Sequence, residues 1–321
     1  MADQLTFPII DVSEIDNPDR QLAIAKEVTA ACQKWGFLLI KGHPIPSSDI
    51  DALFSLSKAF FDLAEDQKEP WPINRQSIGY VGSLKDRARD DKMSMWFGGL
   101  PGSLDDKEAL PPFWRAHSEK VEAFKHQCHS LVVKLLVAFA IAMDLPDRNF
   151  FADAHGEHVG DGNSLRMLMY PARNEPPDTT GSRMQPHTDS GSVTLLFQQA
   201  AGLEVLGPAG EWVKAPCIKD CILINIGDAL SFWSGTQLKA TLHRVTFDGL
   251  PFNQERQSMA YFGKANPDTV LQPVLPGKAM EKYMTNGLEV QPGITVGELS
   301  EMIMTSIYGS SVSTKPQQVA V

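Results

Sequence analysis

Two histidines and an aspartate in the second half of the chain have the types and spacing of metal ligands. His187 and Asp189 are separated by one residue, and alternate side chains of a strand point to the same face. His243 lies in a second apolar segment and would face the same interior. Two imidazoles and one carboxylate on an octahedral ion leave three positions open, which is typical of non-haem iron(II) oxygenases. Zinc more often has a tetrahedral set with more nitrogen or thiolate ligands.

A second pair of residues has the chemistry of an anion site. A lone His-x-Asp pair is more often part of a surface turn than a metal site, so further evidence is needed. Arg256 and Ser258 open another apolar strand and share one of its faces. Arginine binds a carboxylate through two parallel N–H groups, and an unpaired buried charge costs several kcal/mol. The pair therefore indicates a bound carboxylate, or else a salt bridge to an acidic residue of the core.

The elements that must position these residues are short and rich in β-forming residues. They are separated by turn signals and cover residues 165–170, 193–198, 203–206, 211–214, 221–226, 229–233, 240–246 and 258–262. Such spacing predicts an antiparallel sandwich or double-sheet jelly roll. Upstream, helical periodicity predicts helices over 19–34, 48–63 and 118–143, and apolar runs predict strands at 7–11, 36–40 and 93–97. A last helix is predicted over 296–308.

The chain divides by composition into four parts. These are an N-terminal helix and strand region (1–115), a long helix and connection (116–160), the jelly-roll core (161–265), and a C-terminal helix and tail (266–321). The opening strand is expected to join the later sheets. We therefore predict one compact unit.

Taken in order, the motifs resemble those of the 2-oxoglutarate/iron(II)-dependent dioxygenases, and within them the isopenicillin N synthase-like branch. They read HTDSGSVTLL from 187, GLEV from 202, WV from 212, NIGD from 225, KATLHRV from 239 and RQS from 256. FPIID from 7 and WGFLLIKGHPIP from 35 resemble the N-terminal region of the same branch. The likeness covers roughly residues 6 to 265, and such a co-linear series is far more specific than any one motif.

The resemblance implies a mainly β fold with flanking α-helices, namely a distorted double-stranded β-helix. It implies that the two histidines and the aspartate bind Fe(II). It also implies that Arg256 and Ser258 bind the distal carboxylate of 2-oxoglutarate, with Tyr170 contacting the same group. O₂ then decarboxylates this co-substrate to succinate while the substrate is hydroxylated, desaturated or rearranged. Leu168 is a departure, since many plant members carry Asn at that position.

Substrate contacts are expected from large side chains of the loop-rich 70–113 region and of the strand that Arg256 opens. The candidates are Tyr80, Met93, Met95, Trp96, Phe97 and Phe262. The two methionines and Phe97 would share one strand face, and methionine suits an adaptable apolar pocket. This composition favours a small, largely apolar or aromatic substrate, and specialised metabolism is the expected setting.

Other residues near these motifs have less specific interpretations. The NIGD segment at 225–228 is interpreted as a structural turn. Leu196 and Phe197 either line the co-substrate pocket or pack in the core. The pairs His126/His129 and His155/His158 have the spacing of one helical turn but lack a third ligand, so solvated or internally bonded histidines are the favoured interpretation.

Charge and composition exclude several classes of partner. The 321 residues carry a formal net charge of −10 with a pI near 5.3, and no dense basic run, which argues against nucleic acid and anionic membranes. No apolar stretch reaches the roughly 20 residues of a membrane span, and the N-terminus lacks signal-peptide features. Four scattered cysteines favour a reducing, cytoplasmic location. We expect a monomer or weak homo-oligomer acting on a small molecule.

Two rival functions remain open from the sequence. One is an isopenicillin N synthase-type iron oxidase that does not use 2-oxoglutarate, in which Arg256 and Ser258 would hold a carboxylate of the substrate. The other is a non-catalytic jelly-roll binding protein. The intact ligand set beside an anion-binding pair favours an enzyme, because a binding protein has no need for three open metal positions.

Overall fold

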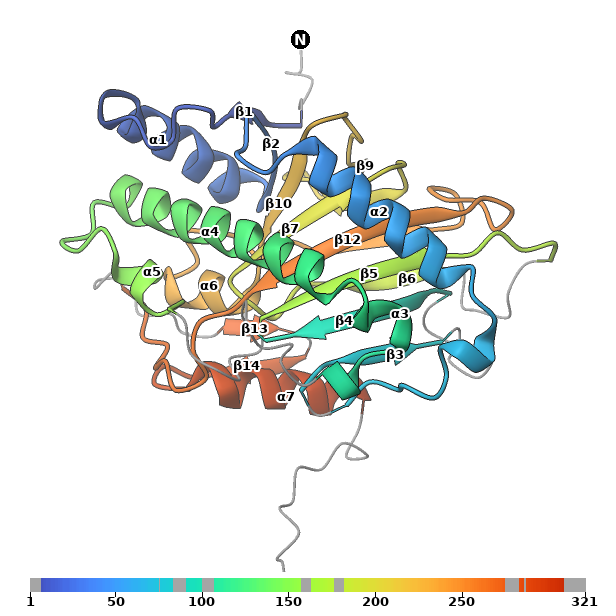
Figure 1. Cartoon of the computed structure of the whole chain (residues 1–321). Coiled ribbons are helices and arrows are strands. Elements are labelled where there is room, and N and C mark those ends of the chain that lie inside the picture. The colour runs from blue at the N-terminus through green and yellow to red at the C-terminus, as the bar shows by residue number, and fades with distance from the viewer. Residues whose placement is uncertain are drawn as a thin grey trace, which may run out of the picture.

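The computed structural model describes residues 7–74, 76–82, 91–99, 107–156, 163–175, 182–274, 283–285 and 287–308. A larger and a smaller β-sheet make its centre, and the helices α1, α2 and α4 lie across one face of the larger sheet (Figure 1). The metal-ligand candidates lie on the opposite face of the larger sheet, in the space between the two sheets.

The larger sheet has the strand order β1-β2-β10-β7-β12-β5-β4-β3, and the smaller sheet has the order β6-β11-β8-β9. The described strands are β1 (Ile9–Asp11), β2 (Phe37–Lys41), β3 (Gly79–Val81), β4 (Met93–Gly98), β5 (Ser164–Tyr170), β6 (Ser182–His187), β7 (Val193–Gln198), β8 (Leu203–Leu206), β9 (Trp212–Lys214), β10 (Ile222–Ile226), β11 (His243–Thr246), β12 (Arg256–Gly263), β13 (Tyr283–Thr285) and β14 (Leu288–Val290). Pairing is antiparallel except between β1 and β2. Strands from the N-terminal region and from the 161–265 core thus share one sheet, and the two facing sheets form the predicted jelly roll.

Alternation along the strands of the larger sheet separates two apolar cores. On β7, Val193, Leu195 and Phe197 face the helices, and the residues between them face the smaller sheet. The core between the sheets includes Leu39 and Leu223. Of the side chains on the larger sheet, only those that point toward the smaller sheet reach the metal-ligand candidates. The face on which a residue lies therefore decides whether it can take part in the site.

The described α-helices are α1 (Pro18–Lys34), α2 (Ser47–Phe61), α3 (Pro112–Arg115), α4 (Ser118–Ala142), α5 (Phe150–Asp153), α6 (Asp228–Trp233) and α7 (Val296–Tyr308). Helix α1 begins where the Asn17 side chain accepts a hydrogen bond from the Asp19 N–H at 3.1 Å, a typical N-cap. Helix α4 is long and apolar enough to cross a membrane, yet 61% of its most apolar window is buried, as expected of a core helix.

One predicted element has the wrong type. Residues 229–233 were expected to form a strand, but they belong to helix α6, which begins at Asp228. A short apolar run that is buried on all sides has no periodicity that separates strand from helix. The strands β3, β13 and β14 have no counterpart among the predicted elements, and β6 corresponds only to the strand assumed around His187. The helix predicted over 296–308 is present as α7.

Candidate metal centre and co-substrate pocket

The structure brings the three metal-ligand candidates together. Nε2 of His187 lies 3.9 Å from Oδ1 of Asp189, and Nε2 of His243 lies 3.8 Å from the same oxygen. One ligand atom from each residue lies within 4.8 Å of the other two. His187 and His243 are cross-strand partners on β6 and β11. The alternation argument assumed that Asp189 is in the same strand as His187. In the structure Asp189 lies in the turn that follows β6.

Both imidazoles are oriented by backbone carbonyl groups. Nδ1 of His187 is 2.9 Å from the Gln185 carbonyl oxygen, and Nδ1 of His243 is 3.2 Å from the Thr241 carbonyl oxygen. A carbonyl oxygen only accepts, so each Nδ1 carries the proton and each Nε2 presents a lone pair. This is the arrangement of metal-bound histidines, whose second nitrogen donates to a carbonyl or carboxylate.

The Asp189 carboxylate is held by one oxygen and open at the other. Oδ2 accepts hydrogen bonds from Thr194 Oγ1 at 2.6 Å and from Asn225 Nδ2 at 2.7 Å. Oδ1 is the atom that faces both imidazoles. The sequence interpretation of 225–228 as a structural turn missed the role of Asn225, because its contact with Asp189 joins strand β10 to a distant turn.

Burial and neighbouring groups set the protonation of His187 and Asp189. Burial lowers the pKa of His187 to about 4, assisted by the neighbouring His243, so the His187 imidazole is neutral at pH 7. Burial alone would raise the pKa of Asp189, but the histidines and the hydrogen bonds from Thr194 and Asn225 together hold it below its ordinary value. A neutral imidazole and an ionised carboxylate are the forms that bind a divalent cation.

Iron(II) fits this set of donors. Two imidazole nitrogens and one carboxylate oxygen, each free of other hydrogen bonds within the described residues, face one point from one side. Such a set leaves the remaining positions of an octahedral ion open. No other group of three or more His, Cys, Asp or Glu with this geometry occurs among the residues that the structure describes.

Arg256 lies in the same pocket as the metal-ligand candidates and is 2% exposed. Its guanidinium donates to Ser258 Oγ at 3.2 Å and to Gln198 Oε1 at 2.9 Å, and its Cζ lies 5.4 Å from the centre of the Tyr170 ring. Burial lowers its pKa, and no carboxylate pairs with it in the described part of the chain. The salt-bridge alternative is therefore not realised there, and the site is ready for an anionic ligand.

The pocket between the sheets has mostly apolar walls. Its lining comprises Phe37, Leu168, Tyr170, Met184, Thr194, Leu196, Leu203, Asn225, Val245, Arg256, Ser258, Ala260 and Phe262 beside the three metal-ligand candidates. Leu196 is one of the lining residues, whereas Phe197 faces the helices, with its ring 5.1 Å from that of Phe124. The Tyr170 hydroxyl is 3.4 Å from Met184 Sδ.

Most of the substrate contacts that were expected from the 70–113 region point away from the pocket, into the core between the larger sheet and the helices. The Tyr80 ring lies 5.8 Å from Phe60 and the Phe97 ring 4.9 Å from Trp114, both in the helix-side core. Met95 is fully buried in that core, and Met93 packs against it. The shared face of Met93, Met95 and Phe97 was predicted correctly, but alternation alone does not say which face meets the pocket.

Phe262, by contrast, lines the pocket as expected. The Arg166 guanidinium stacks between it and Trp96, with Cζ 4.3 Å from the Phe262 ring and 3.4 Å from the Trp96 ring. Trp96, the remaining candidate of β4, does not line the pocket itself but is connected to the pocket wall at Phe262 through Arg166.

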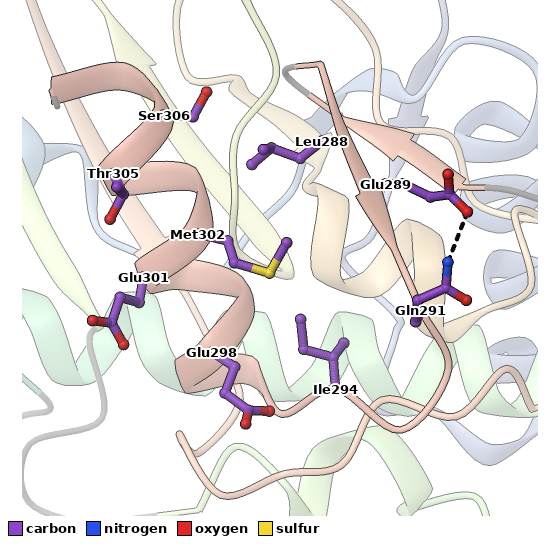
Figure 2. Close-up of a pocket in the computed structure, with 9 residues that line it drawn as sticks. All are labelled: Leu288, Glu289, Gln291, Ile294, Glu298, Glu301, Met302, Thr305 and Ser306. Atoms are coloured by element: carbon purple, nitrogen blue, oxygen red, sulfur yellow. Dashed lines mark hydrogen bonds between the residues drawn. The ribbon is translucent and has the colours of Figure 1, made fainter. Parts of the chain in front are cut away.

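A separate surface groove lies between β14 and α7. Figure 2 shows Leu288, Ile294 and Met302 directed into it, with Gln291 hydrogen-bonded to Glu289 at its edge. The groove contains glutamates but no histidine or cysteine. Its volume is larger than that of the pocket between the sheets, but it lacks the donor set of a metal centre, so we assign the chemistry to the pocket between the sheets.

The described members of the two histidine pairs singled out from the sequence, His126/His129 and His155/His158, have internal partners or are exposed to solvent. His155 is buried, with Nδ1 2.6 Å from the Phe151 carbonyl and Nε2 2.8 Å from Ser192 Oγ. His129 lies 3.4 Å from the Tyr261 hydroxyl, and His126 is exposed on α4. His158 lies outside the described residues.

Comparison with known proteins identifies the family. Residues 7–116 match the N-terminal region of the non-haem dioxygenases described for morphine synthesis, and residues 162–265 match the 2OG-Fe(II) oxygenase superfamily. The chain is 34% identical to UPF0676 protein C1494.01 of Schizosaccharomyces pombe, over 97% of this chain and 95% of that protein. It is 35% identical to proline hydroxylase buaE of Petromyces alliaceus, over 78% of this chain and 84% of that protein.

A solved structure extends this likeness to three dimensions. The full-length Neurospora crassa protein crystallised with alpha-KG and thymine superposes with a TM-score of 0.79 at 27% identity, over 95% of this chain and 98% of that chain. The chain belongs to the 2-oxoglutarate/iron(II)-dependent oxygenases. It is an enzyme, and its cofactors are iron(II) and 2-oxoglutarate.

Proposed function

We propose that this protein oxidises a small, largely apolar molecule, with His187, Asp189 and His243 as its iron ligands. The observation that carries the proposal is the convergence of two Nε2 atoms on one carboxylate oxygen, at 3.9 and 3.8 Å, within one buried pocket. The chemistry supplied by bound iron(II) and 2-oxoglutarate is activation of O₂, with release of succinate and CO₂. The protein must hold these groups and the substrate in place.

Arg256, Ser258 and Tyr170 are proposed to hold the distal carboxylate of 2-oxoglutarate. Arg256 is pre-positioned by Gln198, which accepts one N–H group at 2.9 Å. Ser258 follows it on the same face of β12, and the Tyr170 ring packs beside the guanidinium. A guanidinium and a hydroxyl together offer charge-assisted hydrogen bonds to a carboxylate, and the buried setting makes those bonds stronger than in water.

The substrate is proposed to lie on the side of the pocket that Ala260 and Phe262 form. Phe262 is the cross-strand neighbour of Thr194, whose hydroxyl bonds Asp189, so this wall is beside the metal-ligand candidates. Apolar walls favour apolar substrates and also exclude water from the reaction. One relative named as a proline hydroxylase and one similar structure that holds thymine are in keeping with a small-molecule substrate.

Succinate release measured with and without candidate substrates tests the proposal. Purified protein with iron(II) should release succinate from 2-oxoglutarate slowly alone and faster with a true substrate. His187→Ala should abolish both rates, whereas His126→Ala, which removes an exposed histidine of α4, should leave them unchanged. Oxidation of a substrate with iron(II) and O₂ but without succinate would instead favour the oxidase that does not use 2-oxoglutarate.

A further inference from the structure

Asp228 is a buried carboxylate next to the metal centre that is not one of the ligand candidates. It is 2% exposed and opens helix α6. Its Oδ2 accepts hydrogen bonds from Thr188 Oγ1 at 2.8 Å and from Thr285 Oγ1 at 2.6 Å, and its Oδ1 accepts from the Tyr283 hydroxyl at 3.2 Å. Thr188 is the residue between His187 and Asp189. One carboxylate thus joins the ligand turn to residues near the C-terminus.

The backbone at the start of α6 is hydrogen-bonded to the segment that contains Asp189. The Asp228 N–H donates to the Asp189 carbonyl at 2.7 Å, and the Gly227 N–H donates to the Ser192 carbonyl at 2.9 Å. Gly227 has no space for a side chain, since a Cβ there would lie 2.2 Å from the Gly191 carbonyl oxygen. The start of α6 and the ligand turn are therefore in direct backbone contact, and movement of one moves the other.

Two of the three hydroxyl groups that bond Asp228 come from the β13–β14 hairpin. Tyr283 and Thr285 are both on β13, and both are buried. The Tyr283 ring packs edge-on against Phe232 of α6, at 5.4 Å between ring centres. Figure 1 shows this hairpin between α6 and α7. It lies outside the two regions, 7–116 and 162–265, that match the family models, so those matches do not assign it a role.

We propose that Asp228 is a positioning residue through which the β13–β14 hairpin holds the turn after His187, and with it the ligand Asp189, in place. The inference rests on the proposed ligand set. Asp189 follows the last residue of β6, so the ladder of strand hydrogen bonds does not fix its direction. Thr188 and the Asp189 carbonyl, both bonded to Asp228, supply that constraint instead. Tyr283 and Thr285 keep the carboxylate in the position that reaches Thr188.

Anaerobic titration of the full chain with Fe(II), without 2-oxoglutarate or substrate, tests this coupling directly. Thr285→Val removes one hydroxyl at nearly constant volume and should weaken Fe(II) binding about tenfold, the lower end of the range for groups that orient metal ligands. Asp228→Asn should weaken it at least as much, because one acceptor oxygen is lost. Thr285→Ser restores the hydroxyl and should return the affinity to within about twofold of wild type.

Two buried residues away from this network serve as matched controls. Thr29→Val makes the same change of side chain at a buried position on α1, where the hydroxyl bonds no described residue, and Tyr261→Phe matches Tyr283→Phe by removing a buried hydroxyl that faces His129. The controls should leave Fe(II) affinity unchanged even where they lower the melting temperature. Tyr283→Phe removes the longest of the three bonds and should give a smaller loss of affinity than Thr285→Val, which provides a second variant if the first is unstable.

Unchanged Fe(II) affinity in both Thr285→Val and Asp228→Asn would overturn the inference, even if both variants melt at lower temperature, since the network would then be only structural. Equal affinity losses in Thr285→Val and Thr285→Ser would overturn it too, because the hydroxyl would not be the cause. Failure of the wild-type chain to bind Fe(II) would instead contradict the proposed function itself. The two failures are therefore distinguishable.

Discussion

Asn225 donates a hydrogen bond of 2.7 Å to Oδ2 of Asp189 and thereby commits that oxygen, so that only Oδ1 faces the two imidazoles. The donor is on β10 and the acceptor is in the turn after β6, so the contact joins elements of both sheets. A ligand carboxylate that is bonded at one oxygen binds a metal through the other with little reorganisation. The relationship explains why an amide, and not an apolar side chain, occupies this buried position.

Asn225→Ala should weaken Fe(II) binding by about 10- to 100-fold, because the Asp189 carboxylate loses a partner that orients it. An anaerobic Fe(II) titration, monitored by mass spectrometry under native conditions, measures the change in affinity. Asn163→Ala is the matched control, since Asn163 is similarly buried and bonds the Lys264 backbone, not Asp189. If the two variants lost the same affinity, general loss of stability and not ligand orientation would be the cause.

Arg256→Ala should raise the 2-oxoglutarate concentration needed for half-maximal succinate release by about 10- to 100-fold, the value of a charge-assisted hydrogen bond to a carboxylate. Fe(II) affinity in the absence of 2-oxoglutarate should not change, because Arg256 bonds Ser258, Gln198 and Ala200 and none of the ligand candidates. Arg256→Lys keeps the charge but loses the bidentate geometry, so its 2-oxoglutarate requirement should lie between those of the wild type and of Arg256→Ala. An unaltered co-substrate requirement in the alanine variant would refute the assignment of this residue.

The convergence of the three metal-ligand candidates could be predicted from the sequence because His243 lies in an apolar strand-like segment and His187 is one residue away from a carboxylate. His243 and Arg256 needed only the alternation of β11 and β12 to be aimed into the interior. The strand that holds His187 was harder to delimit. It ends at His187, and Asp189 is placed by Asn225 and Thr194, contacts between segments that no local pattern contains.

The residues on the substrate side of the pocket could not be predicted from the local sequence pattern either, because their placement depends on contacts between distant segments. Met95 and Phe97 alternate correctly with Ser94 and Trp96, but both faces of β4 are apolar enough to be buried. Which face meets the helices depends on the pairing of β4 with β5, and of β5 with β12. Register in a sheet that is covered on both sides is a property of the assembled fold, and so is the choice between pocket and core.

Phe262→Ala and Met95→Ala should separate substrate binding from core packing. Phe262→Ala should raise KM for the substrate, and change the preference among substrates of different size, because it enlarges the pocket wall. Met95→Ala should leave KM unchanged but lower the free energy of unfolding by about 2–5 kcal/mol, because it opens a cavity in the helix-side core. Substrate kinetics and urea denaturation on the same preparations measure both quantities. A raised KM in Met95→Ala without loss of stability would contradict the placement of that side chain.

His155 should make the stability of the metal-free protein depend on pH. Burial lowers its pKa from an ordinary value near 6.5 to about 4, so the unfolded chain binds a proton that the folded chain does not bind between those two pH values. The stabilisation is present above pH 6.5 and is lost as the pH falls toward 4. From pH 7 to pH 5 the folded state should lose about 2 kcal/mol from this group alone.

His155→Gln removes the titrating ring, so its urea-unfolding free energy should fall less steeply between pH 7 and pH 5 than that of the wild type. A chelator must be present in both samples, because bound metal would alter the protonation of His187. The pKa of His187 is also lowered to about 4, but its contribution is common to both proteins and cancels in the difference. The variant should be less stable than wild type at pH 7, since Ser192 and the Phe151 carbonyl lose a well-placed partner, and this deficit should shrink at pH 5. A deficit that stays the same at both pH values would mean that His155 does not titrate on unfolding.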